Sequence, residues 1–257
     1  MSELHDRLEM LGASAERGSR ARAFAGALLL TIVGSVLSLV VYMLFRPAVT
    51  GLLEPSFPAL GALVLTKGSQ VGFALIVGAY LGLTRRWDEY VQLRWPSLHD
   101  LLWVVLGTAG LDLMAEASQL VLPLLGLSIG LLSGTGSGGL DVGLETWPVL
   151  WPLVFLALYL LPALAEEGFI RGIVQGRLRD TFHPVWEVVL GAGLFALMHG
   201  LYGVGRGPEF LAAYLVLLFG QGLAFCLTYE RTRNLLVVAA VHALSWTEFD
   251  ALFFGLF

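Results

Sequence analysis

Five ionisable residues in the second half of the chain have types and spacings that could do chemistry. Two adjacent glutamates, Glu166 and Glu167, precede Arg171, and single histidines follow at His199 and His242. Because Glu167 and Arg171 are four residues apart, they share one face of a helix and can form an ion pair. Glu166 points about 100° away from Glu167, so its carboxylate stays available to hold or move a proton.

Three of these side chains are expected at a similar depth in a membrane. Charged groups inside membrane helices are costly, and they usually face the interior of a helix bundle, a cavity or each other. At a rise of 1.5 Å per residue, Glu166, His199 and His242 lie about 20, 22 and 14 Å from the polar ends of their helices. The spacing therefore predicts that the three groups form one site on neighbouring helices.

A carboxylate and two imidazoles suit three kinds of chemistry. They can activate water, with one imidazole stabilising an oxyanion. They can bind zinc, because two histidines and one glutamate form a hydrolytic ligand set. They can also relay protons in a transporter. A second acidic pair, Asp112 and Glu116, lies in the first half of the chain. We expect this pair to form a polar contact between helices. If the protein were a proton-coupled carrier, the pair would be part of its proton path.

The composition decides what kind of structure positions these residues. The chain has 257 residues, of which 57% are hydrophobic and 14% are charged, against roughly 25% charged in a soluble domain. Its mean hydropathy is +0.78, so a soluble protein of this length could not bury its apolar surface. The net charge is -5 and the 15 basic residues are scattered, which argues against a nucleic-acid partner. These numbers predict one integral membrane domain in contact with the lipid bilayer.

Apolar runs of about 20 residues mark the expected membrane spans. We predict an all-α, polytopic membrane protein with seven or eight transmembrane helices, because the short apolar segment 52–64 could add one. A cytoplasmic tail is expected over residues 1–22, a first group of helices over 23–146, and a second group with the ionisable residues over 147–257. The spans are expected near Ala23–Phe45, Gln70–Thr84, Leu101–Leu125, Trp147–Ile170, Val185–Tyr202, Glu209–Tyr229 and Leu235–Phe254.

The distribution of basic residues predicts the orientation. Cytoplasmic connections carry an excess of Lys and Arg. With seven spans and the N-terminus inside, twelve arginines fall on the inner side, and only Arg46, Lys67 and Arg206 fall on the outer side. This split predicts a cytoplasmic N-terminus. The abundance of Leu, Ala and Gly, and of Arg over Lys, is compatible with a prokaryotic cell membrane. The oligomeric state is not indicated.

In this order and on membrane helices, the ionisable residues resemble the motifs of a known family. The family is that of the CAAX proteases and bacteriocin-processing proteins (CPBP), which includes the Ras-converting CAAX prenyl endopeptidases. The resemblance covers roughly Trp147 to Trp246, somewhat under half of the chain. It rests on Glu166-Glu167-x-x-x-Arg171, on Phe195-x-x-x-His199 and on His242.

The resemblance implies an all-helical membrane fold with its site between helices and open toward the cytosol. It implies that Glu166 and His199 activate water to hydrolyse a peptide bond of a membrane-associated protein or peptide, with or without a prenyl group. Glu167 and Arg171 would be supporting groups, and His242 would help to hold the tetrahedral oxyanion. No cofactor is implied, although the residue types leave a zinc ion open.

One position departs from the family pattern. The family has Asn or Asp four residues after the second histidine, and this chain has Trp246 there. An indole can donate one hydrogen bond but has no carbonyl group. Losing one oxyanion donor typically slows an enzyme ~100- to 1,000-fold. The chain could thus be a slow protease, a protease with other donors, or a membrane scaffold or bacteriocin-immunity protein without catalysis.

Overall fold

The computed structural model describes residues 2–53, 55–132, 149 and 151–246, and every element in this part of the chain is helical. The first group of helices comprises α1 (Ser2–Leu52), α2 (Pro58–Thr66), α3 (Gly68–Thr84), α4 (Trp87–Tyr90), α5 (Leu98–Leu124) and η1 (Ile129–Leu132). The second comprises α6 (Trp151–Phe155), η4 (Leu156–Leu160), α7 (Leu161–Glu167), η5 (Gly168–Gln175), α8 (Gly176–Arg179), α9 (Pro184–Gly200), η6 (Leu201–Gly203), α10 (Pro208–Thr232) and α11 (Leu235–Ser245).

Within the described residues, five helices are long and apolar enough to cross a membrane, namely Ser19–Leu52, Leu98–Leu124, Pro152–Arg179, Pro184–Gly203 and Pro208–Thr232. Two more predicted spans coincide with shorter apolar helices, α3 with 17 residues and α11 with 11. At 1.5 Å per residue, α11 is only about 16 Å long, roughly half of the hydrocarbon core. The all-helical membrane architecture is therefore confirmed, and the count of seven or eight spans is not. Residues 247–254 of the last predicted span lie outside the described part.

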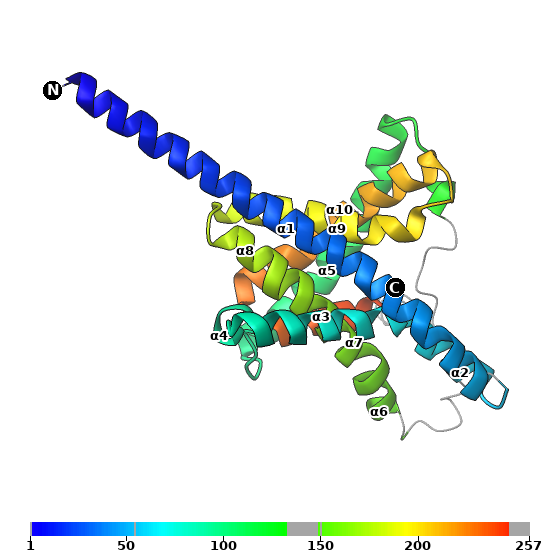
Figure 1. The fold of residues 1–257 in the computed structure, drawn as a ribbon. Helices are drawn as coiled ribbons and strands as arrows, with labels where there is room; N and C mark the ends of the chain where they lie inside the picture. Colours follow the sequence, from blue (N-terminus) through cyan, green and yellow to red (C-terminus); the bar gives the residue numbers. More distant parts are fainter. Residues whose placement is uncertain (1, 54, 133–148, 150, 247–257) are drawn as a thin grey trace.

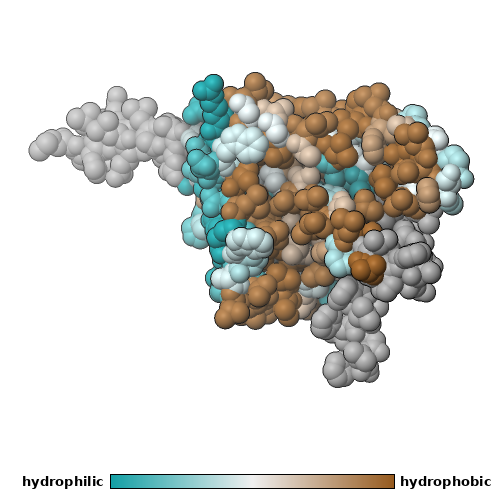
Figure 2. Space-filling view, turned by 90° about the horizontal axis from the view of Figure 1, so that it is seen from below, coloured by the Kyte–Doolittle hydropathy of each residue, from teal (hydrophilic) through white to brown (hydrophobic). Residues whose placement is uncertain are grey.

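Many large apolar side chains are exposed on the surface of the helices. Leu83, Leu120 and Leu124 are among many large apolar residues that stand fully out from the helices. The face of the molecule drawn in Figure 2 is largely apolar, with hydrophilic residues gathered in a band at one edge. That edge is the side on which α4 and α8 lie in Figure 1. An exposed apolar belt of this kind is unfavourable in water and is what lipid tails require.

The helices pack so that α7 lies between two others. Helix α7 contacts α3 and α11, while α10 packs against both α9 and α5. Helix α1 runs obliquely across the bundle and packs along α3 (Figure 1). The main apolar core includes Phe169, Phe195 and Phe225. This arrangement brings segments from the first group of helices against the helix that carries the two glutamates.

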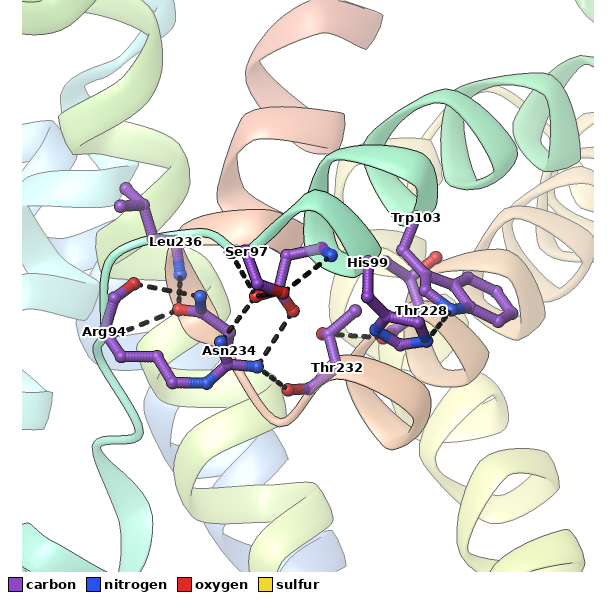
Figure 3. Close-up of polar contacts among 9 residues, drawn as sticks. Arg94, Ser97, His99, Trp103, Thr228, Thr232, Asn234 and Leu236 are labelled. Atoms are coloured by element: carbon purple, nitrogen blue, oxygen red, sulfur yellow. Dashed lines mark hydrogen bonds and ion pairs between the residues drawn. The ribbon is translucent and has the colours of Figure 1, made fainter.

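Basic residues gather at one end of the bundle, where a polar cluster ties α5, α10 and α11 together. The guanidinium of Arg94 binds the carboxylate of Asp100 and donates to the carbonyl of Thr232 at 2.8 Å. The side chain of Asn234 donates to the carbonyl of Arg94 at 2.9 Å, and Ser97 with Asp100 caps the first turn of α5. Figure 3 shows these side chains converging from the α4–α5 loop and the α10–α11 turn. The cluster fixes the start of α11 and hence the position of His242.

Residues Pro152–Arg179 form one continuous helix with two stretches of wider, π-helical turns, η4 and η5. Segments of this kind are rare in proteins and occur frequently at functional sites. The second stretch, η5, begins directly after Glu167 and contains Arg171. Gly172 within it lets the chain at Tyr90 approach closely, because a Cβ there would lie 2.7 Å from the Tyr90 carbonyl oxygen.

Gly172→Ala is therefore expected to lower the free energy of unfolding by about 1–3 kcal/mol, the usual cost of overpacking a well-packed core. The added methyl group would meet backbone, which cannot rotate away. Gly193→Ala on α9 is the matched control, since a Cβ there meets nothing within 4 Å and alanine favours helices. Denaturant unfolding in one detergent measures both variants. Equal stability of the two would show that the Tyr90 contact is not tight.

Candidate active site

The carboxylate of Glu166 is the centre of a buried polar site. Its Oε1 lies 3.0 Å from Nε2 of His199 on α9, and its Oε2 accepts a hydrogen bond of 3.0 Å from Nε2 of Gln70 on α3. The residue is 1% exposed. A carboxylate so deep in an apolar bundle must have partners, and both of its oxygens are held by side chains from other helices.

His199 presents one defined ring nitrogen to Glu166. Its Nδ1 lies 3.1 Å from the carbonyl oxygen of Phe195, one turn earlier on α9. Since a carbonyl oxygen only accepts, Nδ1 carries a hydrogen and donates it. The Nε2 atom and Oε1 of Glu166 are then two acceptors in contact, and this contact is stable only when one proton lies between them. The pair can thus take up and release a proton as a unit.

Glu167 forms a second buried cluster beside the first. Its Oε1 lies 2.6 Å from Nδ1 of His242 on α11, and its Oε2 lies 3.2 Å from Nε of Arg171. The side chains of Glu167 and Arg171 are fully buried, and that of His242 is 5% exposed. The pairing of Glu167 with Arg171 matches their four-residue spacing. The pairing of Glu167 with His242, which is 75 residues away along the chain, is decided by the packing of α11.

The guanidinium of Arg171 is also held by aromatic rings. Its central carbon lies 4.5 Å from the ring centroid of Phe195 and 5.1 Å from that of Phe225. Arginine stacks favourably on aromatic faces because its planar cation is weakly hydrated. Phe225 also packs against His242, with ring centroids 4.8 Å apart. Phe225 therefore contacts both partners of Glu167, Arg171 and His242.

The comparisons with known proteins bear on the segment that contains this site. Residues 148–246 match a family model described as type II CAAX prenyl endopeptidase Rce1-like. This part of the chain is therefore similar to the CAAX protease family. The match includes α6 to α11, and thus both glutamates, Arg171 and both histidines. Neither the curated proteins nor the solved structures contain a match to the chain.

The C-terminal edge of the segment that matches the family model holds the residue that departs from the family pattern. The ring of Trp246 lies beside that of His242, with centroids 4.4 Å apart. The ammonium group of Lys67 lies 3.5 Å from the centroid of the Trp246 ring. Ser245 is exposed and donates to the carbonyl of His242, so its hydroxyl is used within α11.

His199 is the most accessible group of the site, with a side chain that is 17% exposed while that of Glu166 is 1% exposed. His199 lies near the last residue of α9. The first residue of α9, Pro184, lies at the opposite end of that helix, close to Arg179 and the other basic residues at that end of the bundle. The accessible edge of the site therefore lies toward the end of the bundle that is away from the basic residues.

Two further polar residues at the candidate active site come from the first group of helices. Gln70 and Lys67 belong to the start of α3 and the turn before it. The polar run Lys67-Gly68-Ser69-Gln70 at the head of an apolar helix was the only sequence signal for them. The acidic pair predicted on α5, Asp112 and Glu116, does not contribute Glu116 to this site. Glu116 is exposed and accepts a hydrogen bond from Gln119 on the same helix.

Metal binding was one of the chemistries that the residue types allowed. Within the described part of the chain, no group of three or more His, Cys, Asp or Glu side chains is placed to share one ion. The glutamates and histidines are instead arranged as two pairs, each in direct contact. The absence of a cofactor remains a prediction.

Proposed function

We propose that the protein is an intramembrane endopeptidase in which Glu166 and His199 activate water to hydrolyse a peptide bond. The observation that carries this proposal is the 3.0 Å contact between Glu166 Oε1 and His199 Nε2, in a segment that is similar to the CAAX protease family. The substrate is a membrane-associated protein or peptide. Prenylated C-terminal peptides are the first class to test, because the family description names them.

In this mechanism the proton-sharing pair acts on a water molecule bound beside it. The water oxygen forms a bond to the carbonyl carbon, and its proton passes to the pair. The carbonyl electron pair becomes an oxyanion, and we assign Nε2 of His242 to it because Nδ1 is held by Glu167. When the C–N bond breaks, the pair returns the proton to the leaving amine. General acid–base catalysis of this kind typically contributes 10²–10⁴-fold in rate.

The direct test uses purified protein in detergent and internally quenched peptides, with and without a C-terminal S-farnesyl cysteine motif. Cleavage is expected with the wild type and not with His199→Ala. A chelator is expected to leave the rate unchanged, because the pair activates water without a metal ion. Loss of activity on chelation, with recovery on added zinc, would show that a metal ion activates the water and that the pair does not act alone. Wild-type rates in His199→Ala would refute both.

A non-catalytic membrane scaffold or immunity protein is the second candidate, and Trp246 is the observation that favours it. The indole packs beside His242 at the position where the family has Asn or Asp. A scaffold would tolerate Glu166→Gln and His199→Asn with its cellular phenotype intact. A protease would lose its phenotype with either change, so complementation by these two variants separates the candidates.

We further propose that the N-terminus is cytoplasmic in a prokaryotic cell membrane. The support is the gathering of arginines, Arg94, Arg177, Arg179 and Arg233 among them, at one end of the bundle, as expected for the cytoplasmic side. In that orientation the accessible edge of His199 faces the opposite half of the membrane, and substrate entry from the cytosol is not favoured. A reporter fused to the N-terminus reads the orientation directly.

A further inference from the structure

Lys67 is the single lysine of the chain, and it stands at the edge of the candidate active site. It occupies the turn where α2 ends and α3 begins. Its Nζ lies 3.5 Å from the ring centroid of Trp246 and 5.3 Å from that of Tyr159. Glu166 is close enough to attract it electrostatically. A cation is therefore held between aromatic faces beside the water-activating pair.

The other charged donors near Glu166 already have partners. Arg171 is paired with Glu167 and stacked between phenylalanine rings. His199 uses both of its ring nitrogens, and Nδ1 of His242 faces Glu167. Within the described residues, no carboxylate lies within the 4.0 Å of an ion pair with Lys67. Lys67 therefore has N–H donors that no carboxylate of the described residues occupies.

We propose that the ammonium group of Lys67 donates a hydrogen bond to the oxyanion that forms when water adds to the scissile carbonyl. This inference rests on the proposed endopeptidase function and assigns a residue to its site. Lys67 keeps its own proton throughout, because it stabilises the negative charge on the carbonyl oxygen and the pair of Glu166 and His199 carries the proton. His242 and Lys67 would then approach the oxyanion from α11 and from the α2–α3 turn.

The placement of Trp246 fits this role. Tryptophan is the best aromatic partner for a cation, and its ring holds Nζ at 3.5 Å next to the ring of His242. A side chain four residues after His242 would otherwise supply the second donor itself. Here the indole positions a donor that comes from the α2–α3 turn. The departure from the family pattern and the position of the only lysine therefore have one explanation.

The kinetic test compares Lys67→Met with Lys67→Arg on the quenched peptides. Loss of one oxyanion donor lowers kcat by ~100- to 1,000-fold, so Lys67→Met should lose that much with KM within about threefold of wild type. Lys67→Arg keeps a cation on the Trp246 ring and should retain more kcat than Lys67→Met. Arg206→Met is the control, because Arg206 stacks on Phe210 at 3.8 Å outside the site. A kcat in Lys67→Met equal to that of the control would overturn the inference and leave the proposed function standing.

The pH dependence gives a readout that a merely structural lysine would not change. Burial lowers the pKa of Lys67 from its usual 10.5 to about 8, with Glu166 opposing the shift. The rate should therefore fall above about pH 8 as the ammonium loses its proton, and Lys67→Arg should move this fall to higher pH. The neighbouring titratable groups, Glu166, Tyr159, His199 and His242, are unchanged in that variant. An identical alkaline fall in both proteins would contradict the assignment.

A binding test separates failure of this inference from failure of the proposed function. A peptide phosphonate carries a negative tetrahedral group like the oxyanion, whereas the parent peptide amide does not. Wild type should bind the phosphonate at least ~100-fold more tightly than the amide, and Lys67→Met should lose this preference. If wild type cleaves no peptide but retains a Lys67-dependent preference, the donor role stands without turnover. Equal binding of phosphonate and amide by wild type would overturn the inference.

Discussion

Replacing Glu166 by glutamine is expected to slow peptide cleavage by ~100- to 10,000-fold, the range of a lost general base. Glutamine has the shape of glutamate, so its amide oxygen can still accept from Gln70 and its amide nitrogen can still donate to Nε2 of His199. The buried site stays filled and hydrogen-bonded. The loss should thus appear in kcat with the folded protein intact, as measured by cleavage and by unfolding of the same preparation.

Two comparisons make the Glu166 experiment specific. Glu116→Gln is the matched control, because it removes an exposed carboxylate on α5 and should leave cleavage unchanged. The double variant Glu166→Gln with His199→Asn should be no slower than either single variant, since residues that act as one unit are non-additive. If Glu166→Gln cleaved as fast as wild type, activation of water by this pair would be wrong. If the two single losses multiplied, the residues would act in separate steps.

Replacing Arg171 by methionine is expected to have the largest effect on stability, a loss of about 3–5 kcal/mol in the free energy of unfolding. Removal of one partner of a buried ion pair leaves an uncompensated charge, and the cost of that charge falls in this range. The side chains of Arg171 and Glu167 are both 0% exposed, so water cannot replace the guanidinium. Methionine fills much of the volume that the arginine side chain occupies between Phe195 and Phe225. The measured loss therefore reports the missing charge rather than a packing defect.

Denaturant unfolding in detergent measures this loss against two references. Arg233→Met removes a half-exposed partner of Glu230 and should cost at most about 1 kcal/mol. Adding Glu167→Gln to Arg171→Met removes the stranded charge and should recover a large part of the stability. A single-variant loss no greater than that of Arg233→Met would mean that Glu167 does not depend on Arg171, and that His242 alone holds it.

The sequence was sufficient where one local pattern determined the outcome. The long apolar runs predicted the positions of the membrane helices, because burial in lipid requires nothing beyond apolar side chains and a satisfied backbone. The four-residue spacing predicted the contact between Glu167 and Arg171 for the same local reason, and helical rise placed Glu166, His199 and His242 at similar depths. The number of spans was less predictable, because α11 is apolar throughout but only 11 residues long.

Only the tertiary structure decided how the polar groups are shared. Gln70 reaches Glu166 from 96 residues away, and His242 reaches Glu167 rather than Glu166. No periodicity encodes these pairings, because they depend on which helices become neighbours and on how each is rotated. The same holds for Lys67, which the sequence placed among the few outer basic residues and the fold placed over Trp246. The five residues with catalytic potential were visible in the sequence, whereas their arrangement as one pair beside a cluster of three follows from the packing of α3, α9 and α11 around one glutamate helix.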